Sequence, residues 1–371
     1  MPSPALTIAI VSTQRRWHGG EEQARLLAVG LRQRGHRCVF LARRDGALAQ
    51  RMTADGFEVF PFTGGGRSPL ALCQLRRHLR RIKPDVLHYN DSHAMTGAGL
   101  AAWGLHVPAR IAARRVDFPL RSPRPYRWFS DRVVCVSRAV AQVCEAGGIA
   151  PEMLRVVHDG VDPARVRSGD RQRGRRSLAL TDDQVLLLTV AKLTDHKGHR
   201  FLLDALPAVI QKVPNVVVAL AGDGELRGSL QQQAQRLGIQ SHVRFLGYRD
   251  DVPDLIHAAD VFVLPSHMEG LCSTLIDVML AARTIVTTTA GGIPDLVGCD
   301  EPGAEPVAWT APPRDSMKLA EAILRALASS DECAAMRQRA RLRAEQLFTA
   351  NHMVEATLAV YREAVERDER R

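Results

Sequence analysis

The sequence has few of the features that mark secreted, zinc-binding or membrane-spanning proteins. Its seven cysteines are scattered over 371 residues without a CxxC pair, which indicates neither a disulfide framework nor a zinc cluster. No apolar run approaches the roughly 18 residues needed to span a bilayer. The N-terminus has no basic stretch ahead of a long apolar core and does not resemble a signal peptide. We therefore expect a cytoplasmic protein, or one bound peripherally to the inner face of the membrane.

Negative charge is scarce in the first half of the chain. Residues 1–170 contain 26 Lys and Arg against 14 Asp and Glu, whereas the remainder contains 24 against 26. The first half is therefore expected to face an acidic partner, with a phosphorylated substrate, anionic lipid and nucleic acid as the options. Nucleic acid is not expected, because no basic motif is interleaved with aromatic residues.

Strand-like and helix-like segments alternate along the chain, the pattern of parallel sheets with crossover helices. The length suits two domains better than one. In the first half we expect helices at 21–35 and 69–82 and strands at 6–12, 37–42, 57–62, 85–90, 109–113, 132–136 and 154–157. The second half repeats the pattern with helices at 199–212, 225–237 and 273–282 and strands at 185–191, 216–222, 243–247, 261–265 and 284–288.

These segments predict an α/β fold with two Rossmann-like domains and a cleft between them. An Arg-rich polar stretch that starts at residue 163 has little to bury, so we assign 163–182 to an interdomain linker. The domains are then 1–162 and 183–345. Residues 346–371 form a C-terminal helical segment that could return to the first domain.

Three loops carry residues suited to a phosphorylated sugar ligand. Gly19 and Gly20 precede a helix, whose N-terminal N–H groups suit a phosphate or sugar oxygen. Lys192 and Lys197 follow a strand and could neutralise a pyrophosphate leaving group. Taken alone, the glycine turn is equally compatible with an ordinary tight turn, and loop lysines are common on protein surfaces.

The third loop, 265–277, joins a strand to a helix and contains Glu269 and Asp277. Two carboxylates eight residues apart could accept hydrogen bonds from two different sugars, while the helix start and the hydroxyls of Ser273 and Thr274 hold phosphate oxygens. The spacing alone is also compatible with one acid near a helix cap and one acid on a solvated helix face.

The order of these segments resembles glycosyltransferase family 4 over nearly the whole chain. The matching motifs are the GG-x-E turn at 19–22, the basic loop at 192–198, the GDG turn at 222–224, the segments at 247–256 and 260–266, the Glu-seven-Glu motif at 269–277 and the GG-[IV]-P-[DE] turn at 291–295. The resemblance implies the two-Rossmann architecture called GT-B. It also implies a retaining, metal-independent transfer of sugar from a UDP- or GDP-sugar, without a further cofactor.

The resemblance also implies roles for single residues. Glu269 would contact hydroxyls of the donor sugar, Asp277 the ribose, and Lys192 with Lys197 the diphosphate. His93 aligns with a histidine beside the transferred sugar, and with Glu269 and the two lysines it completes the expected catalytic set. The other expected donor contacts are Gly20, Gly222, Gly270, Leu271, Cys272, Ser273 and Thr274, with the backbone at Tyr248 and Arg249 near the nucleobase.

Two positions depart from the family pattern. Asp277 stands where relatives usually have glutamate, which makes the side chain about one methylene shorter. Lys192 stands where they usually have arginine, which keeps the charge and loses bidentate geometry. Both changes could alter donor affinity or preference.

The acceptor is expected on the basic first domain. Arg114, Arg115 and Asp117 lie on a loop that could meet an acidic acceptor, such as a lipid-linked or phosphorylated glycan of the cell envelope, including lipopolysaccharide or capsule. The helix at 69–82 has a basic face, which is compatible with an anionic membrane surface or with an ordinary solvated helix face. A nucleotide-sugar epimerase of the same architecture and an inactive nucleotide-binding relative remain as alternative functions.

Overall fold

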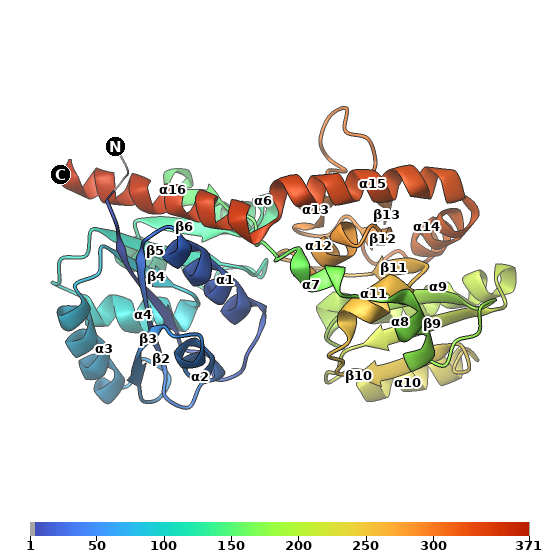
Figure 1. The fold of residues 1–371 in the computed structure, drawn as a ribbon, viewed down its shortest axis with the longest axis horizontal. Helices are drawn as coiled ribbons and strands as arrows, with labels where there is room; N and C mark the ends of the chain where they lie inside the picture. The colour runs from blue at the N-terminus through green and yellow to red at the C-terminus, as the bar shows by residue number, and fades with distance from the viewer. Residues whose placement is uncertain (1–3, 371) are drawn as a thin grey trace. The chain divides into compact units, whose positions relative to one another are not determined.

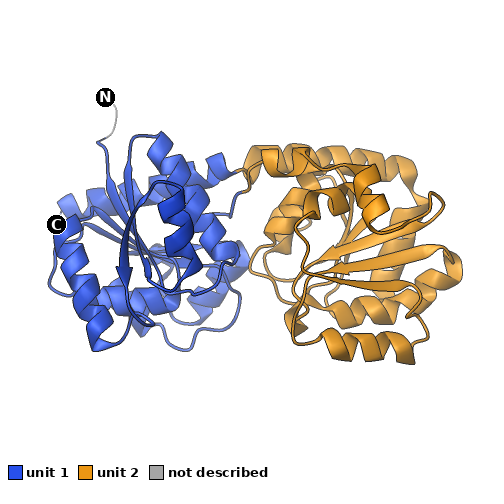
Figure 2. Ribbon diagram, turned by 60° about the horizontal axis from the view of Figure 1, so that its bottom comes forward, with its two compact units in different colours: residues 1–160, 350–371 blue, residues 161–349 orange. Residues whose placement is uncertain are grey.

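The computed structural model describes residues 4–370. The chain divides into two compact units, unit 1 with residues 1–160 and 350–371 and unit 2 with residues 161–349 (Figure 2). Residues 1–3, which open the first expected domain, and residue 371, which closes the C-terminal segment, lie outside the described part.

Unit 1 is built on a parallel sheet (Figure 1), whose strand order is β3-β2-β1-β4-β5-β6-β7. Its strands are β1 (Thr7–Ser12), β2 (Arg37–Arg43), β3 (Glu58–Phe62), β4 (Val86–Tyr89), β5 (Ala109–Arg114), β6 (Arg132–Cys135) and β7 (Leu154–Val156). Its helices are α1 (Gly19–Gln33), α2 (Ala47–Ala54), α3 (Pro69–Ile82), α4 (Ser92–Ala101), α5 (Arg124–Phe129), α6 (Arg138–Ala146) and α16 (Ala350–Glu369). The central strands are buried and mostly apolar because helices cover both faces of the sheet.

Helix α16 belongs to unit 1 although it follows unit 2 in the sequence. It packs against α1, β5 and β6. The hydroxyl of Tyr361 lies 2.8 Å from Nδ1 of His88, and both side chains are buried. Arg132 and Arg155 donate hydrogen bonds to the carboxylate of Glu363, so the C-terminal helix is held by charge as well as by apolar packing.

Unit 2 repeats the architecture with the strand order β10-β9-β8-β11-β12-β13. Its strands are β8 (Val185–Val190), β9 (Val216–Ala221), β10 (Val243–Gly247), β11 (Val261–Leu264), β12 (Thr284–Thr288) and β13 (Trp309–Ala311). Its helices are α7 (Ala164–Arg167), α8 (Arg171–Ser177), α9 (His199–Lys212), α10 (Arg227–Arg236), α11 (Val252–Ala258), α12 (Ser273–Leu280), α13 (Ile293–Val297), α14 (Ser316–Ala328) and α15 (Ser330–Leu347). The α/β class with two Rossmann-like units is as predicted.

The segment 163–182 is not a linker. It contains α7 and α8, and α8 packs closely against α11 of unit 2. Gly174 allows this approach, since a Cβ there would lie 2.3 Å from the backbone oxygen of Asp254. Arg173 pairs with the Asp254 carboxylate, and Arg171 pairs with Asp260. The arginines that suggested a solvated linker are instead the partners of acidic side chains in the folded unit.

In both sheets the strand order reverses beside the first strand. β1 lies between β2 and β4, and β8 lies between β9 and β11. In open parallel sheets, ligands bind at the carboxyl ends of the strands near such a reversal. The loops after β1, β4, β8 and β11 are therefore the places to look for a site. Within residues 4–370, none of the helices combines the length and the apolar character that crossing a bilayer requires.

Candidate functional site

The loops after β8 and β11 bring Lys197 and Glu269 together in unit 2. The Nζ atom of Lys197 lies 2.6 Å from Oε2 of Glu269, and only 16% and 8% of the two side chains are exposed. The hydroxyl of Ser266 donates a second hydrogen bond to Oε2 at 3.2 Å. The result is a charged, largely desolvated ion pair at the carboxyl edge of the sheet. Lys197 and Ser266 both contact Oε2 of Glu269, and neither makes a hydrogen bond to Oε1.

His267 connects the two loops. Its backbone N–H donates to the carbonyl oxygen of His196 at 2.9 Å. Arg314 can only donate, so the His267 Nδ1 atom 3.3 Å away accepts, and Nε2 then carries the proton that faces Asp195 at 3.2 Å. The ring itself is buried. Lys197 and Glu269 are thus placed by a hydrogen-bonded framework rather than by two independent surface loops.

Two glycines allow the site loops to approach one another. Gly198 has φ +69°, and a Cβ there would lie 1.9 Å from the backbone oxygen of Pro265. Gly291 has φ +52°, a Cβ there would lie 2.0 Å from the backbone oxygen of Glu269, and the N–H of Gly292 donates to that oxygen at 2.8 Å. The GG-[IV]-P-[DE] turn therefore packs against the backbone of Glu269 and holds it through this hydrogen bond.

Replacing Gly291 by alanine is expected to destabilise unit 2. The left-handed backbone alone costs about 1–2 kcal/mol for a residue with a Cβ, and the contact with the Glu269 oxygen forces a backbone shift. We expect a loss of more than about 2 kcal/mol in urea unfolding, together with reduced activity. The matched control is Gly228→Ala at the start of α10, where a Cβ meets nothing within 4 Å. Equal stability of the two variants would contradict this assignment.

The start of α12 lies directly after the Glu269 turn. Cys272 is its N-cap residue and makes no side-chain cap hydrogen bond, so the first N–H groups of the helix are not closed by a side chain. Ser273 and Thr274 are half-buried in the first turn, while Gly270 and Cys272 are buried and Leu271 is half-buried. Such a helix start can hold an anion.

Asp277 lies one turn further into α12 and is 1% exposed. Its Oδ2 atom lies 3.4 Å from an NH2 nitrogen of Arg165, and its Oδ1 atom is buried without a hydrogen-bond partner. Burial raises the pKa of the Asp277 carboxyl to about 6, and the Arg165 guanidinium opposes that rise. The carboxyl therefore has an unused acceptor oxygen, and it is ionised above about pH 6.

The remaining donor-side candidates lie on loops of the same sheet edge. Lys192 is exposed after β8. The GDG turn lies against this loop, with the N–H of Gly222 donating to Gly247 and the N–H of Leu193 donating to Asp223. Tyr248 is 81% exposed. The guanidinium of Arg249 is bound by Asp251, so at this position the backbone is more available to a ligand than the side chain.

In unit 1, Gly20 and His93 lie at the carboxyl ends of β1 and β4. Gly20 is half-buried at the start of α1, and its carbonyl oxygen accepts a hydrogen bond from the side chain of Asn90 at 3.2 Å. His93 is exposed in the first turn of α4. Asp91 caps that helix through the N–H of Ala94 and also binds the Thr13 hydroxyl at 2.7 Å.

The sequence analysis did not single out Glu21 or Asn90, which link these loops. Glu21 is buried and accepts hydrogen bonds from Ser12 and from Asn90. Burial raises the pKa of Glu21, and the Ser12 hydrogen bond opposes this rise. Glu21 directly follows the glycine pair, but an acid in the first turn of a helix is usually a surface residue, so its burial could not be predicted from the sequence.

Arg114 and Arg115 are bound within unit 1. Arg114 donates to the carbonyl oxygen of Phe118 in its own loop. Arg115 donates to Asn90 at 2.9 Å and to Asp159 at 3.2 Å. Their geometry therefore favours a supporting role over the acceptor contacts expected from the sequence. Asp117 is half-buried on the same loop.

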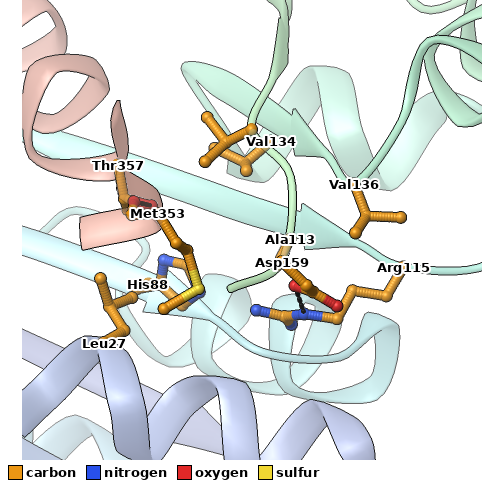
Figure 3. A pocket seen from close by; sticks show the side chains of 10 residues that line it. Leu27, His88, Ala113, Arg115, Val134, Val136, Asp159, Met353 and Thr357 are labelled. Atoms are coloured by element: carbon orange, nitrogen blue, oxygen red, sulfur yellow. Dashed lines mark hydrogen bonds and ion pairs between the residues drawn. The ribbon is translucent and has the colours of Figure 1, made fainter. Parts of the chain in front are cut away.

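A small cavity adjoins the Arg115–Asp159 pair (Figure 3). Its volume of about 10 Å³ suits a water molecule but no sugar. It is lined by the buried ring of His88 together with apolar side chains from the sheet, α1 and α16, among them Leu27, Val134 and Met353. Burial raises the pKa of Asp159 and lowers the pKa of His88 to about 3. This cavity belongs to the interior of unit 1 and not to a substrate site.

The sequence matches two glycosyltransferase families, one in each half. Residues 17–165 match "Glycosyltransferase Family 4", and residues 170–343 match "Glycosyl transferases group 1". Within the described residues 4–370, no group of three or more His, Cys, Asp or Glu side chains is arranged to hold a metal ion.

The chain is similar to several curated proteins and solved structures. It is 30% identical to glycogen synthase of Mycobacterium tuberculosis over 313 residues, which cover 76% of this chain and 69% of that protein. It is 28% identical to the lipopolysaccharide core biosynthesis glycosyltransferase LpsE of Rhizobium meliloti over 221 residues, 59% of this chain and 60% of that protein.

The structure of HepE from Anabaena, determined with UDP and glucose, superposes with a TM-score of 0.83 at 22% identity and covers 96% of this chain and 99% of that one. This likeness shows the GT-B fold. With other curated relatives the match spans about half of their length, as in the D-inositol 3-phosphate glycosyltransferase of Saccharomonospora viridis, of which 56% is covered. The paired family matches and the similarity to glycogen synthase confirm the family expected from the sequence motifs: the chain belongs to glycosyltransferase family 4.

Proposed function

We propose that this protein is a retaining glycosyltransferase that moves a sugar from a nucleotide-diphosphate sugar to a hydroxyl of a glycan or lipid-linked acceptor. The observation that carries the proposal is the Lys197–Glu269 pair beside the open start of α12. An ammonium and a helix N-terminus at one sheet edge suit the diphosphate of such a donor, which gains negative charge as it leaves, and the carboxylate beside them suits the hydroxyls of its sugar.

In this mechanism the diphosphate is the leaving group, and its charge is stabilised without a metal ion. Lys197 has three N–H donors, so it can keep its contact with Glu269 and donate to a phosphate oxygen. Lys192 and the first N–H groups of α12 supply further positive potential. Glu269, paired with Lys197, accepts hydrogen bonds from hydroxyls of the transferred sugar and fixes its orientation.

The chemical step is a front-face displacement. The bond between the anomeric carbon and the phosphate oxygen breaks, and its electron pair leaves with the nucleotide diphosphate. The acceptor oxygen forms the new bond on the same face, and its proton passes to the departing phosphate. The protein needs no covalent nucleophile for this route, and His93 would orient groups near the transferred sugar rather than form a bond with it.

The acceptor side of the proposal rests on charge. Unit 1 carries the basic surplus of the first half of the chain, and Arg77, Arg80, Arg81 and Lys83 are exposed on or next to α3. An acidic cell-envelope glycan or a lipid-linked acceptor fits this surface, as does peripheral binding to an anionic membrane. The match to a lipopolysaccharide core glycosyltransferase supports this acceptor class.

A thermal-shift screen of nucleotide sugars tests the donor. A selective donor is expected to raise the midpoint of unfolding, with UDP- or GDP-sugars above the free monophosphates, in the presence of EDTA. The selected donor is then incubated with acceptor fractions, and the products are identified by mass spectrometry. A glycosylated acceptor supports transfer, whereas an epimerised donor without transfer would establish the epimerase alternative. Failure of every nucleotide diphosphate to shift the midpoint would contradict the proposal.

A further inference from the structure

Arg165 is a charged residue next to the donor loops that neither the family motifs nor the sequence analysis singled out. It lies on α7, in the segment that was expected to be a linker. Its side chain is 48% exposed, and its NH2 nitrogen lies 3.4 Å from Oδ2 of Asp277. Since α7 packs against both α11 and α12, the guanidinium is carried by the folded unit rather than by a mobile tether.

Only one of the two carboxylate oxygens of Asp277 has a partner in the protein. Oδ2 faces Arg165, while Oδ1 is buried and has no hydrogen-bond partner among the described residues. A buried acceptor without a donor is costly, and a ligand hydroxyl at Oδ1 would remove that cost. Asp277 is also one methylene shorter than the glutamate usual at this position, so it reaches less far from α12.

The longer side chain of Arg165 can contact parts of a ligand that the shorter Asp277 side chain does not reach. A guanidinium has five N–H donors on a long side chain, and here it lies half in solvent beside the buried carboxylate. It can keep one N–H toward Asp277 and turn others toward an oxygen of the ligand. An acceptor oxygen on Asp277 and a donor on Arg165, side by side, match two neighbouring hydroxyls, of which one donates and one accepts.

We propose that Arg165 and Asp277 form a clamp for the vicinal hydroxyls of the donor's ribose, and that Arg165 is a specificity-determining residue for ribonucleotides. The clamp rests on the proposed function, because it requires a nucleotide-diphosphate donor in unit 2. It assigns to Arg165 two effects, a direct contact with the ribose and the maintenance of Asp277 as a carboxylate.

The other charged groups on the helices packed against α12 are bound elsewhere or exposed to solvent. Besides α7, α12 packs against α15. On that helix Arg343 is bound by Glu301, Arg339 by the carbonyl of Pro306, and Arg341 by Glu345. Arg337 donates to Thr284, Arg167 is exposed on α7, and the acids Asp331 and Glu332 lie exposed at the far start of α15. Arg165 is the charged neighbour that lowers the pKa of Asp277, which burial raises to about 6.

The test compares Arg165→Gln and Arg165→Lys with Arg167→Gln, a matched change of an exposed arginine on the same helix. Isothermal titration measures the affinity for UDP and GDP, and for their 2′-deoxy analogues, between pH 5.5 and 8. The wild type is expected to prefer the ribonucleotide. Arg165→Gln should weaken ribonucleotide binding by about tenfold and leave the deoxy analogue nearly unchanged, because the lost charged hydrogen bond is made to the 2′-hydroxyl, which the deoxy analogue lacks.

The pH profile separates this role from a purely structural one. Without Arg165 the pKa of Asp277 rises further, so ribonucleotide binding should be lost at a higher pH than in the wild type. Arg165→Lys should restore the wild-type acid limb while recovering only part of the affinity, and Arg167→Gln should behave as the wild type. If the wild type binds a nucleotide diphosphate but Arg165→Gln matches Arg167→Gln in affinity and in pH profile, the clamp is wrong while the proposed function stands. If the wild type binds no nucleotide diphosphate, the proposed function fails and the clamp fails with it.

Discussion

Replacing Glu269 by alanine is expected to abolish sugar transfer while unit 2 stays folded. The carboxylate is paired with Lys197 at the sheet edge, and in the proposed mechanism it holds the hydroxyls of the transferred sugar. Loss of a group that orients the sugar and shapes the charge of the site should lower kcat by at least about 10³-fold. The measurement is release of nucleotide diphosphate at saturating donor and acceptor, with circular dichroism as the check on folding.

The nucleotide part of the donor provides an internal control for this variant. In the proposed mechanism Glu269 contacts the sugar and not the nucleotide, so the affinity for the free nucleotide diphosphate should change little. Glu321→Ala removes an exposed carboxylate of α14 and should leave turnover as in the wild type. Wild-type turnover in Glu269→Ala would show that the acid does not belong to the reacting site.

Replacing Lys197 by alanine is expected to reduce both donor binding and turnover. Lys197 is 16% exposed and lies 2.6 Å from Glu269, so the change leaves a buried carboxylate without its cation and removes a donor to the departing diphosphate. We expect kcat/KM for the donor to fall by about 10²–10³-fold. Unlike Glu269→Ala, this variant should also bind the free nucleotide diphosphate more weakly. Lys318→Ala, on the exposed face of α14, is the matched control.

The double variant tests whether the two residues act as one unit. If the ion pair is the functional element, Lys197→Ala in the Glu269→Ala background should cost far less than it does alone. Fully additive losses would mean that the two side chains act independently and that their contact is incidental. If Lys197→Ala binds and turns over the donor as well as Lys318→Ala does, Lys197 does not belong to the donor site.

Much of the fold could be predicted because short-range sequence patterns determine most of its helices and strands. The helices at 69–82 and 199–212 have the predicted bounds, since an apolar face at helical spacing and a clear cap or loop mark each of them. Strand β13 was missed because its three residues give no periodicity and no run of β-branched residues of the kind found at 154–157. The segment 163–182 was misjudged because its contacts with the rest of unit 2, such as that of Arg173 with Asp254, join residues that lie 81 apart in the sequence.

The candidate site was predictable only in part for the same physical reason. Lys197 and Glu269 were named from motif order, but their contact across 72 residues depends on how β8 and β11 are placed in the sheet. Arg115 was expected to face an acceptor, yet it is held by Asn90 and Asp159, because a loop arginine near the switch point finds acidic and amide partners only once the sheet has formed. Composition shows how many charged side chains a region has, but tertiary packing determines which of them are bound within the protein and which can meet a ligand.

The most direct test of the central claim is hydrogen–deuterium exchange of the protein with and without its selected nucleotide-sugar donor. The account predicts that the donor protects backbone amides in the loop 192–198 and in the segment 266–277, including the first turn of α12, while α10 of the same unit exchanges as before. Protection confined to other segments, or none at saturating donor, would contradict the placement of the donor site at Lys197 and Glu269.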